Sequence, residues 1–576
     1  MEPVFEAGQP LRLGRHGRDG RIGDLVTAQA SKGGPRVVAV HGPARSTRAA
    51  MAALLASEGL GRPFPKAVIA EAEAAADEAG VADPGRQDLT GQRVITIDPE
   101  GAKDHDDAVA VRAEGDATRL WVHIADVARY VPFGGAVDRE AARRGCSVYV
   151  PGAVDPMLPE RLSADVCSLR PGEDRKVVTV EMLVDVAGEV VETRFARAVI
   201  HSRRRLTYPQ VDRLFAGGGL GDAALEADLV VVRALAARLR RRRMARGALG
   251  IETAEPSFTF SGDRVTGVEM EWQTESHSLV EECMIAANEA VARYMLERGR
   301  PTIFRRHEDP EPRSVELLYE RLAALGVATP ARPEGPLTPT ECAAAAVHAS
   351  EAVTKHVARD GGRRSLPVLV LQALRQAHYS SQHVGHSGLA SSAYLHFTSP
   401  IRRYPDLAAH RALLDALGLA GPAADASDLA LEAERSSLTE RAAVSVERRA
   451  DRICLAFLLR DRLEGDRDEA FDGEVTGVGD SGAFVAFGPG LVFDGYLAAR
   501  RIEGDWWRSD LLGVALEGES TGTRIAIGDP VSVRVVDVEP LRGRVDLEPA
   551  DAPRPTSRPA PRGRARPAQR APRKRR

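Results

Sequence analysis

Cysteine is scarce in this chain of 576 residues. None of the five forms a CxxC pair, and they stand at positions 146, 167, 283, 342 and 454. We therefore expect no disulfide framework and no structural zinc site, and this use of cysteine fits a reducing cytoplasm. Long apolar runs are also missing, since none approaches the ~18–20 residues that span a bilayer. The first residues lack a basic segment followed by an apolar one, so we expect neither a secretory signal nor a membrane partner.

Aromatic residues make up only 5% of the chain, whereas 43% of the residues are hydrophobic and 28% are charged. This balance excludes a fibrous or largely unfolded protein and is typical of a globular one. Because single hydrophobic cores stop growing near ~250–300 residues, we expect several domains. Lysine is rare too, with six among 78 basic residues, which we interpret as the codon bias of a GC-rich bacterial genome.

The net charge of −4 conceals an uneven distribution. Residues 551–576 hold nine Arg, one Lys and one Asp, so they carry +9 and leave −13 for the rest of the chain. This segment also has six prolines and almost no apolar side chains, which predicts a disordered tail. An acidic body with a basic tail indicates a polyanionic partner.

Changes of pattern divide the chain into parts. Gly-rich residues 1–62 contain short apolar runs typical of strands, and residues 64–80 have the pattern of a helix. Strands and helices alternate from about 91 to 410, where RLWVHIADVARYV is one of the predicted strands. The charged, Pro-free stretch at 428–464 is helical in pattern, and residues 470–548 switch to short period-two strands with Gly turns.

We therefore predict an α/β mixed multidomain fold. Its expected parts are a partial N-terminal OB or cold-shock-like barrel (1–62), a helix and linker (63–90), a mixed α/β domain (91–415), the helical C-terminal part of that region (416–468), an OB-type barrel (469–548) and the disordered basic tail (549–576). The string GVGDSG (477–482) matches GxGxxG, but no helix follows it, so we interpret it as a hairpin turn. No P-loop motif occurs, and we expect no nucleotide cofactor.

The most informative segment is residues 93–111, RVITIDPEGAKDHDDAVAV. A strand-like run ends at Asp98, a Pro-Glu-Gly turn follows, and Asp104, Asp106 and Asp107 precede a second strand-like run. In an extended chain Asp104 and Asp106 face one way and Asp107 the other, while Asp98 can return to the same site across the turn. We therefore expect four carboxylates to converge.

Carboxylates packed so densely repel one another unless cations neutralise them, and Lys103 is the one permanently charged basic side chain in the cluster. Hard oxygen ligands in this number favour Mg²⁺, with Mn²⁺ as the alternative. Two such ions can polarise a phosphodiester, activate water and hold the leaving oxygen. A solvated acidic turn is disfavoured because both flanks are apolar strands, and the spacing excludes a calcium EF-hand loop.

These residues carry a family resemblance. The pattern I-D-P-x-x-A-K-D-x-D-D-A at 97–108 resembles the signature of the RNB family, the ribonuclease II and ribonuclease R exoribonucleases. Further segments agree with that family in the same order: HIADVARYV (123–131), SVYVPGAVDPMLPERLSADVCSL (147–169), RRLTYPQV (204–211), SHSLVEECMIAANEAVA (276–292), FRRHEDP (304–310), YLHFTSPIRRYPDLAAHR (394–411) and ERAAVSVER (440–448). The resemblance implies an RNB catalytic domain over 91–415 and an S1-type RNA-binding domain over 469–548.

The resemblance also implies site residues. Asp98, Asp104, Asp106 and Asp107 match the family's four metal-site aspartates, and Arg402 matches the arginine that steadies the scissile phosphate. The implied RNA contacts are Tyr149, which stacks near the 3′ end, Tyr208 and Glu281, which meet the terminal nucleotides, Glu447 near the RNA path, and Arg403 beside Arg402. Without the resemblance, a packed tyrosine ring and a capping or solvated glutamate are the simpler interpretations.

The chain departs from the family pattern in two places. Only about 90 residues precede the catalytic domain, where longer members carry two full cold-shock barrels. At the aromatic clamp position of ribonuclease II, this chain has Ile251. From the local sequence, Pro400 or Pro405 could open a helix, and either choice holds Arg402 near a helix N-terminus, a natural phosphate site.

The resemblance implies 3′-to-5′ hydrolysis of single-stranded RNA to nucleoside 5′-monophosphates, with Mg²⁺ as cofactor. We expect a cytoplasmic monomer whose partner is single-stranded RNA. One alternative is an RNA-binding regulator with an inactive nuclease fold, against which the intact aspartate pattern argues. The other is a metal-dependent endonuclease that shares the same chemistry.

Overall fold

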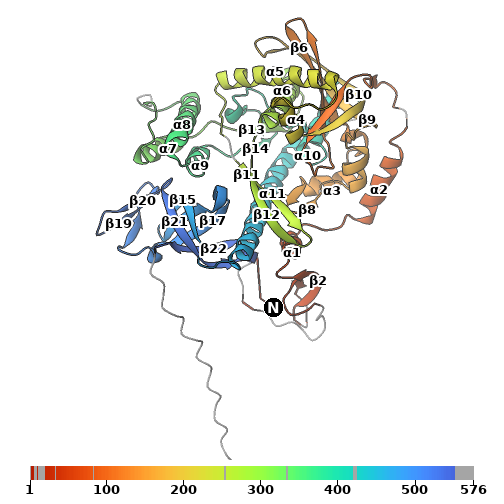
Figure 1. The fold of residues 1–576 in the computed structure, drawn as a ribbon. Coiled ribbons are helices and arrows are strands. Elements are labelled where there is room, and N and C mark those ends of the chain that lie inside the picture. The colour runs from red at the N-terminus through yellow and green to blue at the C-terminus, as the bar shows by residue number, and fades with distance from the viewer. Residues whose placement is uncertain are drawn as a thin grey trace, which may run out of the picture.

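A computed structural model describes residues 2–5, 9–10, 20–30, 32, 34–81, 83–251, 254–331, 335–419 and 424–551. Figure 1 shows two bodies, a larger α/β region and a small C-terminal barrel, joined by one long helix. The predicted tail lies outside the described residues except for positions 549–551. Within the described ranges, no helix is both long and apolar enough to cross a membrane. All five cysteines are free thiols, as expected.

The described N-terminal segment contains two antiparallel strands, β1 (Asp24–Gln29) and β2 (Arg36–Pro43), followed by helix α1 (Thr47–Ser57). We expected strands alone here and did not predict α1, although its Ala- and Leu-rich sequence has a high helix propensity. A partial barrel over 1–62 stays a prediction, because residues 11–19 lie outside the described part. The predicted helix at 64–80 is present as α2 (Lys66–Asp77).

A six-stranded sheet forms the centre of the larger region, in the order β3-β10-β4-β5-β6-β9. Its strands are β3 (Gln87–Asp88), β4 (Val94–Asp98), β5 (Asp107–Glu114), β6 (Ala117–Ala125), β9 (Asp174–Val184) and β10 (Val190–Thr207). The first part of β10 pairs with β9, and its last part pairs with β4. The strand pairings therefore close into a ring, β10-β4-β5-β6-β9-β10. The strand predicted at 119–131 ends earlier, at Ala125, and the 3₁₀ turn Val127–Arg129 follows.

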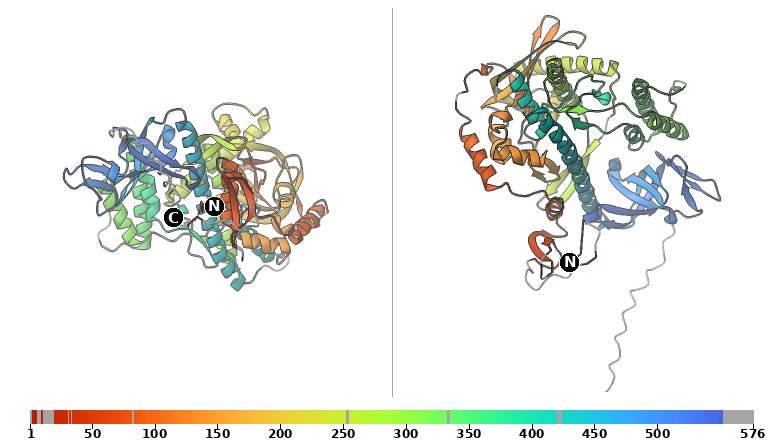
Figure 2. Two further views of the ribbon diagram at one scale, coloured as in Figure 1. Left: turned by 90° about the horizontal axis from the view of Figure 1, so that it is seen from below. Right: turned by 180° about the vertical axis from the view of Figure 1, so that it is seen from behind.

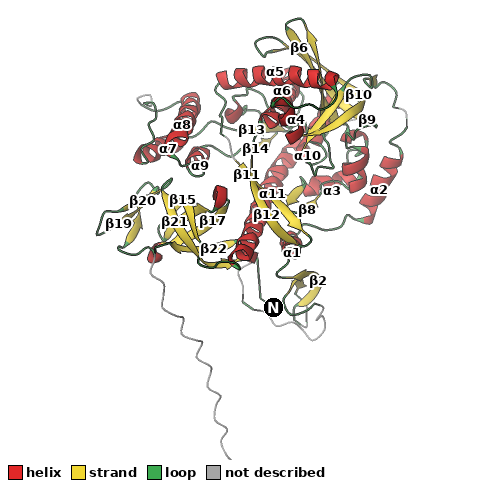
Figure 3. Cartoon of the chain, viewed as in Figure 1, coloured by secondary structure: helices red, strands yellow, loops and turns green. Residues whose placement is uncertain are grey.

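Alternating side chains of this sheet build two cores, one on each face, as the period of two requires. In β4 and β5, Ile95, Ile97 and Val109 belong to one core, whereas Val94 and Ala108 belong to the other. The helices on the first face are α4 (Tyr208–Phe215), α5 (Ala223–Ala245) and α6 (Glu275–Glu297), and α10 (Tyr404–Ala416) contributes residues to both cores. The helices on the other are α2, α3 (Ala136–Arg144) and the π-helical turn Arg161–Val166 (Figure 3).

Helix α11 (Ala426–Leu463) is the longest in the structure and confirms the predicted helical stretch at 428–464. It packs on α1, β7, β14 and the strands of the barrel, and Figure 2 shows it running from the α/β region to that barrel. The closed barrel consists of β15 (Ala470–Gly479), β16 (Gly482–Phe487), β17 (Phe493–Ala498), β21 (Pro530–Glu539) and β22 (Arg544–Pro549). Gly479 pairs with Gly482, so GVGDSG forms the hairpin turn that we predicted.

The remaining described elements are three helices and several short sheets. Strands β13 (Phe304–Arg306) and β14 (His378–Ser380) flank a helical group formed by α7 (Pro312–Ala324), α8 (Pro339–Asp360) and α9 (Leu366–Ala373). That group shares a core with Val514 and Ile527 of the barrel region, and Ile251 packs against the same core. Short sheets complete the fold: β7 (Val148–Val150) with β8 (Ala153–Asp155), β11 (Ala254–Ser261) with β12 (Arg264–Trp272), and β18 (Trp507–Ser509) with β19 (Ala515–Gly518) and β20 (Arg524–Ala526).

Candidate active site

The acidic turn joins the ends of two neighbouring strands. Asp98 is the last residue of β4, and Asp107 is the first residue of β5. Because β4 and β5 are antiparallel, Asp98 and Asp107 lie at the same end of these two neighbouring strands. The parallel pairing of β10 with β4 sets Thr207 beside Asp98, so Tyr208, which begins α4, reaches that end of the strands as well.

Asp106 is buried and meets a segment almost 300 residues further along the chain. Its Oδ1 accepts a hydrogen bond from the backbone N–H of Ile401 at 2.8 Å, and its Oδ2 lies 3.6 Å from Nε of Arg402. Burial raises the pKa of Asp106 well above its usual range, and Arg402 and the Ile401 N–H counteract this only in part. The charges of Asp104 and Asp107 raise the pKa further.

Asp107 and Asp98 repel each other across the turn. Burial and the charge of Asp98 raise the pKa of Asp107 to about 7, against the opposing charges of Arg402 and His105. Oδ2 of Asp98 lies 3.0 Å from Nδ1 of His105, although neither buried atom has the geometry of a hydrogen bond. The site therefore holds more negative charge than its own cations balance.

Tyr149 connects the fourth aspartate with α11. Its hydroxyl donates a hydrogen bond to Oδ2 of Asp104 at 2.7 Å, and its backbone N–H donates to Oε1 of Glu447 at 2.9 Å. The ring is 38% exposed on β7, so one end is fixed by Asp104 while the face can still meet a ligand. The structure thus brings together three residues that sequence reasoning had treated separately.

Tyr208 and Glu281 belong to α4 and α6, two helices that pack on each other. The Tyr208 ring stacks on His277, with 3.8 Å between the ring centroids. Burial raises the pKa of Tyr208, and the charges of Asp107 and Asp98 raise it further. Glu281 is half-exposed one helical turn after His277 and pairs with Arg243 of α5 at 3.8 Å, not with a residue of the acidic turn.

The two predicted arginines differ in their surroundings. Helix α10 begins at Tyr404, so Pro405 and not Pro400 stands in its first turn, and Arg403 is its N-cap residue. Arg402 is 44% exposed beside Asp106, whereas Nη2 of Arg403 donates to the buried Asp406 at 2.7 Å. Burial works against the charge of Arg403, yet Asp406 keeps the pKa of that guanidinium above its usual value. An RNA contact by Arg403 stays a prediction.

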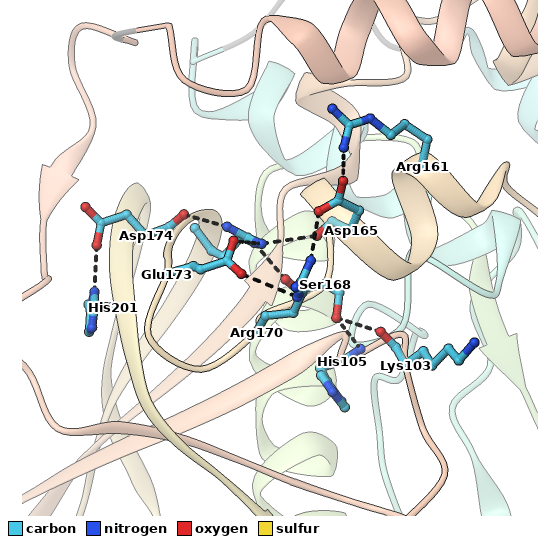
Figure 4. A network of polar contacts seen from close by, with 10 residues as sticks. Lys103, His105, Arg161, Asp165, Ser168, Arg170, Glu173, Asp174 and His201 are labelled. Carbon is cyan, nitrogen blue, oxygen red and sulfur yellow. Dashed lines mark hydrogen bonds and ion pairs between the residues drawn. The ribbon is translucent and has the colours of Figure 1, made fainter.

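Ser168, which lies outside the acidic turn in the sequence, fixes the backbone of that turn. Its hydroxyl donates to the backbone carbonyl of Lys103 at 2.8 Å and accepts from the N–H of His105 at 3.1 Å, as Figure 4 shows. The Lys103 side chain points away and ends 3.9 Å from Glu160, with 76% of its surface exposed. Arg402, not Lys103, is therefore the cation that faces the aspartates.

Two domains of this chain match known protein families. Residues 86–418 match the RNB domain, and residues 466–548 match the S1 RNA binding domain. The chain belongs to the RNB family. Relatives include Ribonuclease R of Escherichia coli, 35% identical over 477 residues, which are 80% of this chain and 57% of that protein. Ribonuclease R of Aquifex aeolicus is 34% identical over 526 residues, 89% of this chain and 72% of that protein.

This RNB-family chain thus spans little more than half of the length of the Escherichia coli relative. Its fold is similar to that of Mycoplasma genitalium RNase R in complex with ribose methylated single-stranded RNA. The TM-score is 0.80 at 25% identity, and the similarity covers 89% of this chain and 80% of the other. The fold also resembles that of yeast Ssd1, a pseudonuclease, with a TM-score of 0.64 at 18% identity over 86% of this chain and 62% of that one. The fold alone therefore does not decide whether an RNB chain cleaves RNA.

The acidic turn of this RNB domain fits a hard cation by its chemistry. Its donors are carboxylates, the buried Oδ2 of Asp98 has no hydrogen-bond partner, and burial with mutual repulsion raises the pKa values of Asp106 and Asp107. The described residues do not gather three or more His, Cys, Asp or Glu side chains into the geometry of a metal site. The carboxylates thus raise one another's pKa without forming a complete metal site among the described residues.

Several residues at this RNB site escaped sequence reasoning. Ser168 and the Ile401 N–H act through backbone contacts, which leave no mark in a side-chain pattern. His277 and Asp406 lie inside segments that carry the resemblance, but nothing in their spacing indicated a stacked ring or a buried anchor. Their position within long matching segments was the one available signal.

Proposed function

We propose that this RNB-family chain is a 3′-to-5′ exoribonuclease that hydrolyses single-stranded RNA to nucleoside 5′-monophosphates. The observation that carries the proposal is the buried Asp106, which lies 3.6 Å from Arg402 in the turn that also carries Asp98, Asp104 and Asp107 between β4 and β5. Relatives named Ribonuclease R and the S1 RNA binding domain at 466–548 support RNA as the substrate. We further infer a role in RNA turnover or processing. The monomeric state and the cytoplasmic location stay predictions.

Asp98, Asp104, Asp106 and Asp107 would hold Mg²⁺, or Mn²⁺ in its place. When bound, such ions polarise a phosphodiester and lower the pKa of water. The protein's own part is to position these carboxylates. The Ile401 N–H fixes Asp106, Ser168 fixes the backbone of the turn, and Tyr149 fixes Asp104. Arg402 lies near enough to Asp106 to stabilise the charge that develops on the scissile phosphate.

We infer that two tyrosine rings hold the end of the RNA. The half-exposed face of Tyr149 lies beside Asp104, and Tyr208 stacks on His277 near Asp107. Base stacking tolerates any sequence, as a degradative nuclease requires. Glu281 would read the ribose 2′-OH, which separates RNA from DNA. The Glu447 side chain supports Tyr149 by accepting a hydrogen bond from the Tyr149 backbone N–H.

An inactive RNA-binding regulator is the strongest alternative, because a pseudonuclease shares this fold. It is disfavoured here because a chain that only binds RNA gains nothing from buried, repelling carboxylates beside one arginine. A metal-dependent endonuclease would use the same chemistry at internal bonds.

One experiment separates these possibilities. A 5′-labelled single-stranded RNA and a DNA of matched sequence are incubated with the protein, with Mg²⁺ or with EDTA. Exonuclease activity gives a shortening ladder and released mononucleotides from RNA only, and EDTA abolishes both. Internal fragments would identify an endonuclease, and a bound but intact RNA would identify a binding protein. Equal hydrolysis of RNA and DNA would contradict the role of Glu281.

A further inference from the structure

The turn that presents Arg402 is anchored by a side chain of α10. Oδ1 of Asp406 accepts two hydrogen bonds, one from the backbone N–H of Ser399 at 2.8 Å and one from Nη2 of Arg403 at 2.7 Å. Asp406 is fully buried, so water does not compete for these contacts. The carboxylate therefore ties both ends of the turn to the first turn of the helix.

The anchored residue reaches Arg402 directly. Oγ of Ser399 accepts a hydrogen bond from Nη2 of Arg402 at 3.1 Å, while Nε of the same guanidinium lies 3.6 Å from Asp106. A chain of contacts thus runs from Asp406 through Ser399 to the guanidinium that faces the acidic turn. Arg402 is 44% exposed, so these contacts restrict a side chain that would otherwise sample many rotamers.

We propose that Asp406 is a positioning residue, which acts through Ser399 to hold the Arg402 guanidinium against the acidic turn. The inference rests on the proposed function, because it assigns Asp406 to the same reaction. Asp406 does not touch the reacting atoms. Its effect is to fix the arginine before substrate arrives, and a displacement of about 1 Å at such a site can cost ~10²-fold in rate.

The test measures the maximal single-turnover rate of RNA hydrolysis for the wild type and for Asp406→Ala, Arg402→Ala and the double variant. Asp406→Asn is the milder substitution, because its oxygen can still accept from Ser399. The matched control is Asp138, which is also buried and also holds the start of α10, by accepting from the Tyr404 hydroxyl at 2.9 Å and pairing with Arg411 at 2.7 Å. Rates are normalised to the folded fraction of each variant.

We expect Asp406→Ala to lower the maximal rate by ~10²-fold with little change in RNA affinity. Asp406→Asn should lower the maximal rate by less than Asp406→Ala does. In the Arg402→Ala background, Asp406→Ala should cause almost no further loss of rate, because Asp406 acts through Arg402. Asp138→Ala should destabilise the fold without this coupling. Equal losses in both backgrounds, or the same loss from Asp138→Ala, would overturn the proposal.

A crystal structure of Asp406→Ala tests positioning without any activity. The Arg402 guanidinium should no longer lie within ion-pair distance of Asp106, and an unchanged guanidinium would reject the proposal. Failure of the wild type to hydrolyse RNA would reject the proposed function instead, and the crystallographic result would still decide whether Asp406 positions Arg402.

Discussion

Two buried aspartates of the α/β region differ in how completely their charge is neutralised. Asp126 is fully buried, and its Oδ2 lies 2.6 Å from Nη2 of Arg86 and 2.7 Å from Nη2 of Arg197. Burial alone would raise the pKa of Asp126, but the charges of Arg197 and Arg86 outweigh burial and lower it. Asp106 is buried to a similar extent beside one arginine at 3.6 Å, and its pKa is raised.

The difference separates a neutralised carboxylate from one whose charge is only partly neutralised. Around Asp126, the two arginines neutralise the charge through Oδ2, although its buried Oδ1 has no hydrogen-bond partner. At the acidic turn, Asp106 has one ion pair, with Arg402, while Asp104 and Asp107 raise its pKa, and this excess negative charge is what the proposed cations would neutralise. An RNB chain can tolerate this cost because Ser168 and Ile401 hold the turn in place through the backbone.

The largest expected effect is on stability at the neutralised site. Asp126→Asn leaves Arg86 and Arg197 without their buried anion and should lower the free energy of unfolding by about 3–5 kcal/mol at pH 7. The pKa of Asp126 is lowered in the fold, so the wild type's advantage is present above about pH 4 and shrinks as the pH falls further. Urea denaturation of both proteins from pH 3 to 7 measures this. A constant difference across that range would contradict the neutralised state of Asp126.

The next effect is on activity at the acidic turn. Asp106→Asn should reduce turnover by at least ~10²-fold, because a charged ligand leaves the transition-state site. RNA affinity should stay the same or increase, since one repelling charge is gone, and the fold should not lose stability. Hydrolysis and filter-binding assays measure the two quantities. Near-normal turnover of Asp106→Asn would contradict the assignment of the four aspartates as metal ligands.

Removal of the metal sharpens the comparison further. At a concentration ~100-fold above its Kd, Mg²⁺ should raise the free energy of unfolding of the wild type by about 2.7 kcal/mol, because it binds the folded state alone. Asp106→Asn should respond much less, and Asp126→Asn should respond like the wild type. Thermal melts with Mg²⁺, with EDTA, and with NaCl of equal ionic strength provide the measurement. The same Mg²⁺ response in all three proteins would place the cation elsewhere.

The smallest expected effect concerns the tyrosine that borders the turn. Tyr149→Ala should weaken binding of the last nucleotides of the RNA by ~1–3 kcal/mol. The shortest RNA fragment that remains at the end of the reaction should therefore be longer. Tyr149→Phe keeps the ring and removes only the hydrogen bond to Asp104, so we expect about 1 kcal/mol or less. Gel analysis of the final products distinguishes the two variants. Identical products from both would mean that the ring packs in the fold without contacting RNA.

Local features of this chain could be predicted from the sequence. The strand–turn–strand around the four aspartates, the helices α2 and α11 and the hairpin turn at Gly479–Gly482 depend on near neighbours in the sequence, and all are present. The resemblance to the RNB family also came from continuous segments. Helix α1 was not predicted, because we assigned its short sequence to strands together with the apolar runs that precede it.

The sequence by itself determined where the aspartates stand and which strands deliver them. Only the tertiary structure decided which cation pairs with them, since Arg402 meets Asp106 across 296 positions while nearby Lys103 points toward Glu160. The same holds for Tyr149 with Asp104 and for Asp126 with Arg86 and Arg197. The physical reason is that strand and helix periods are set by adjacent residues. Charge balance in a buried site instead depends on sheet register and helix packing, which bring distant segments together.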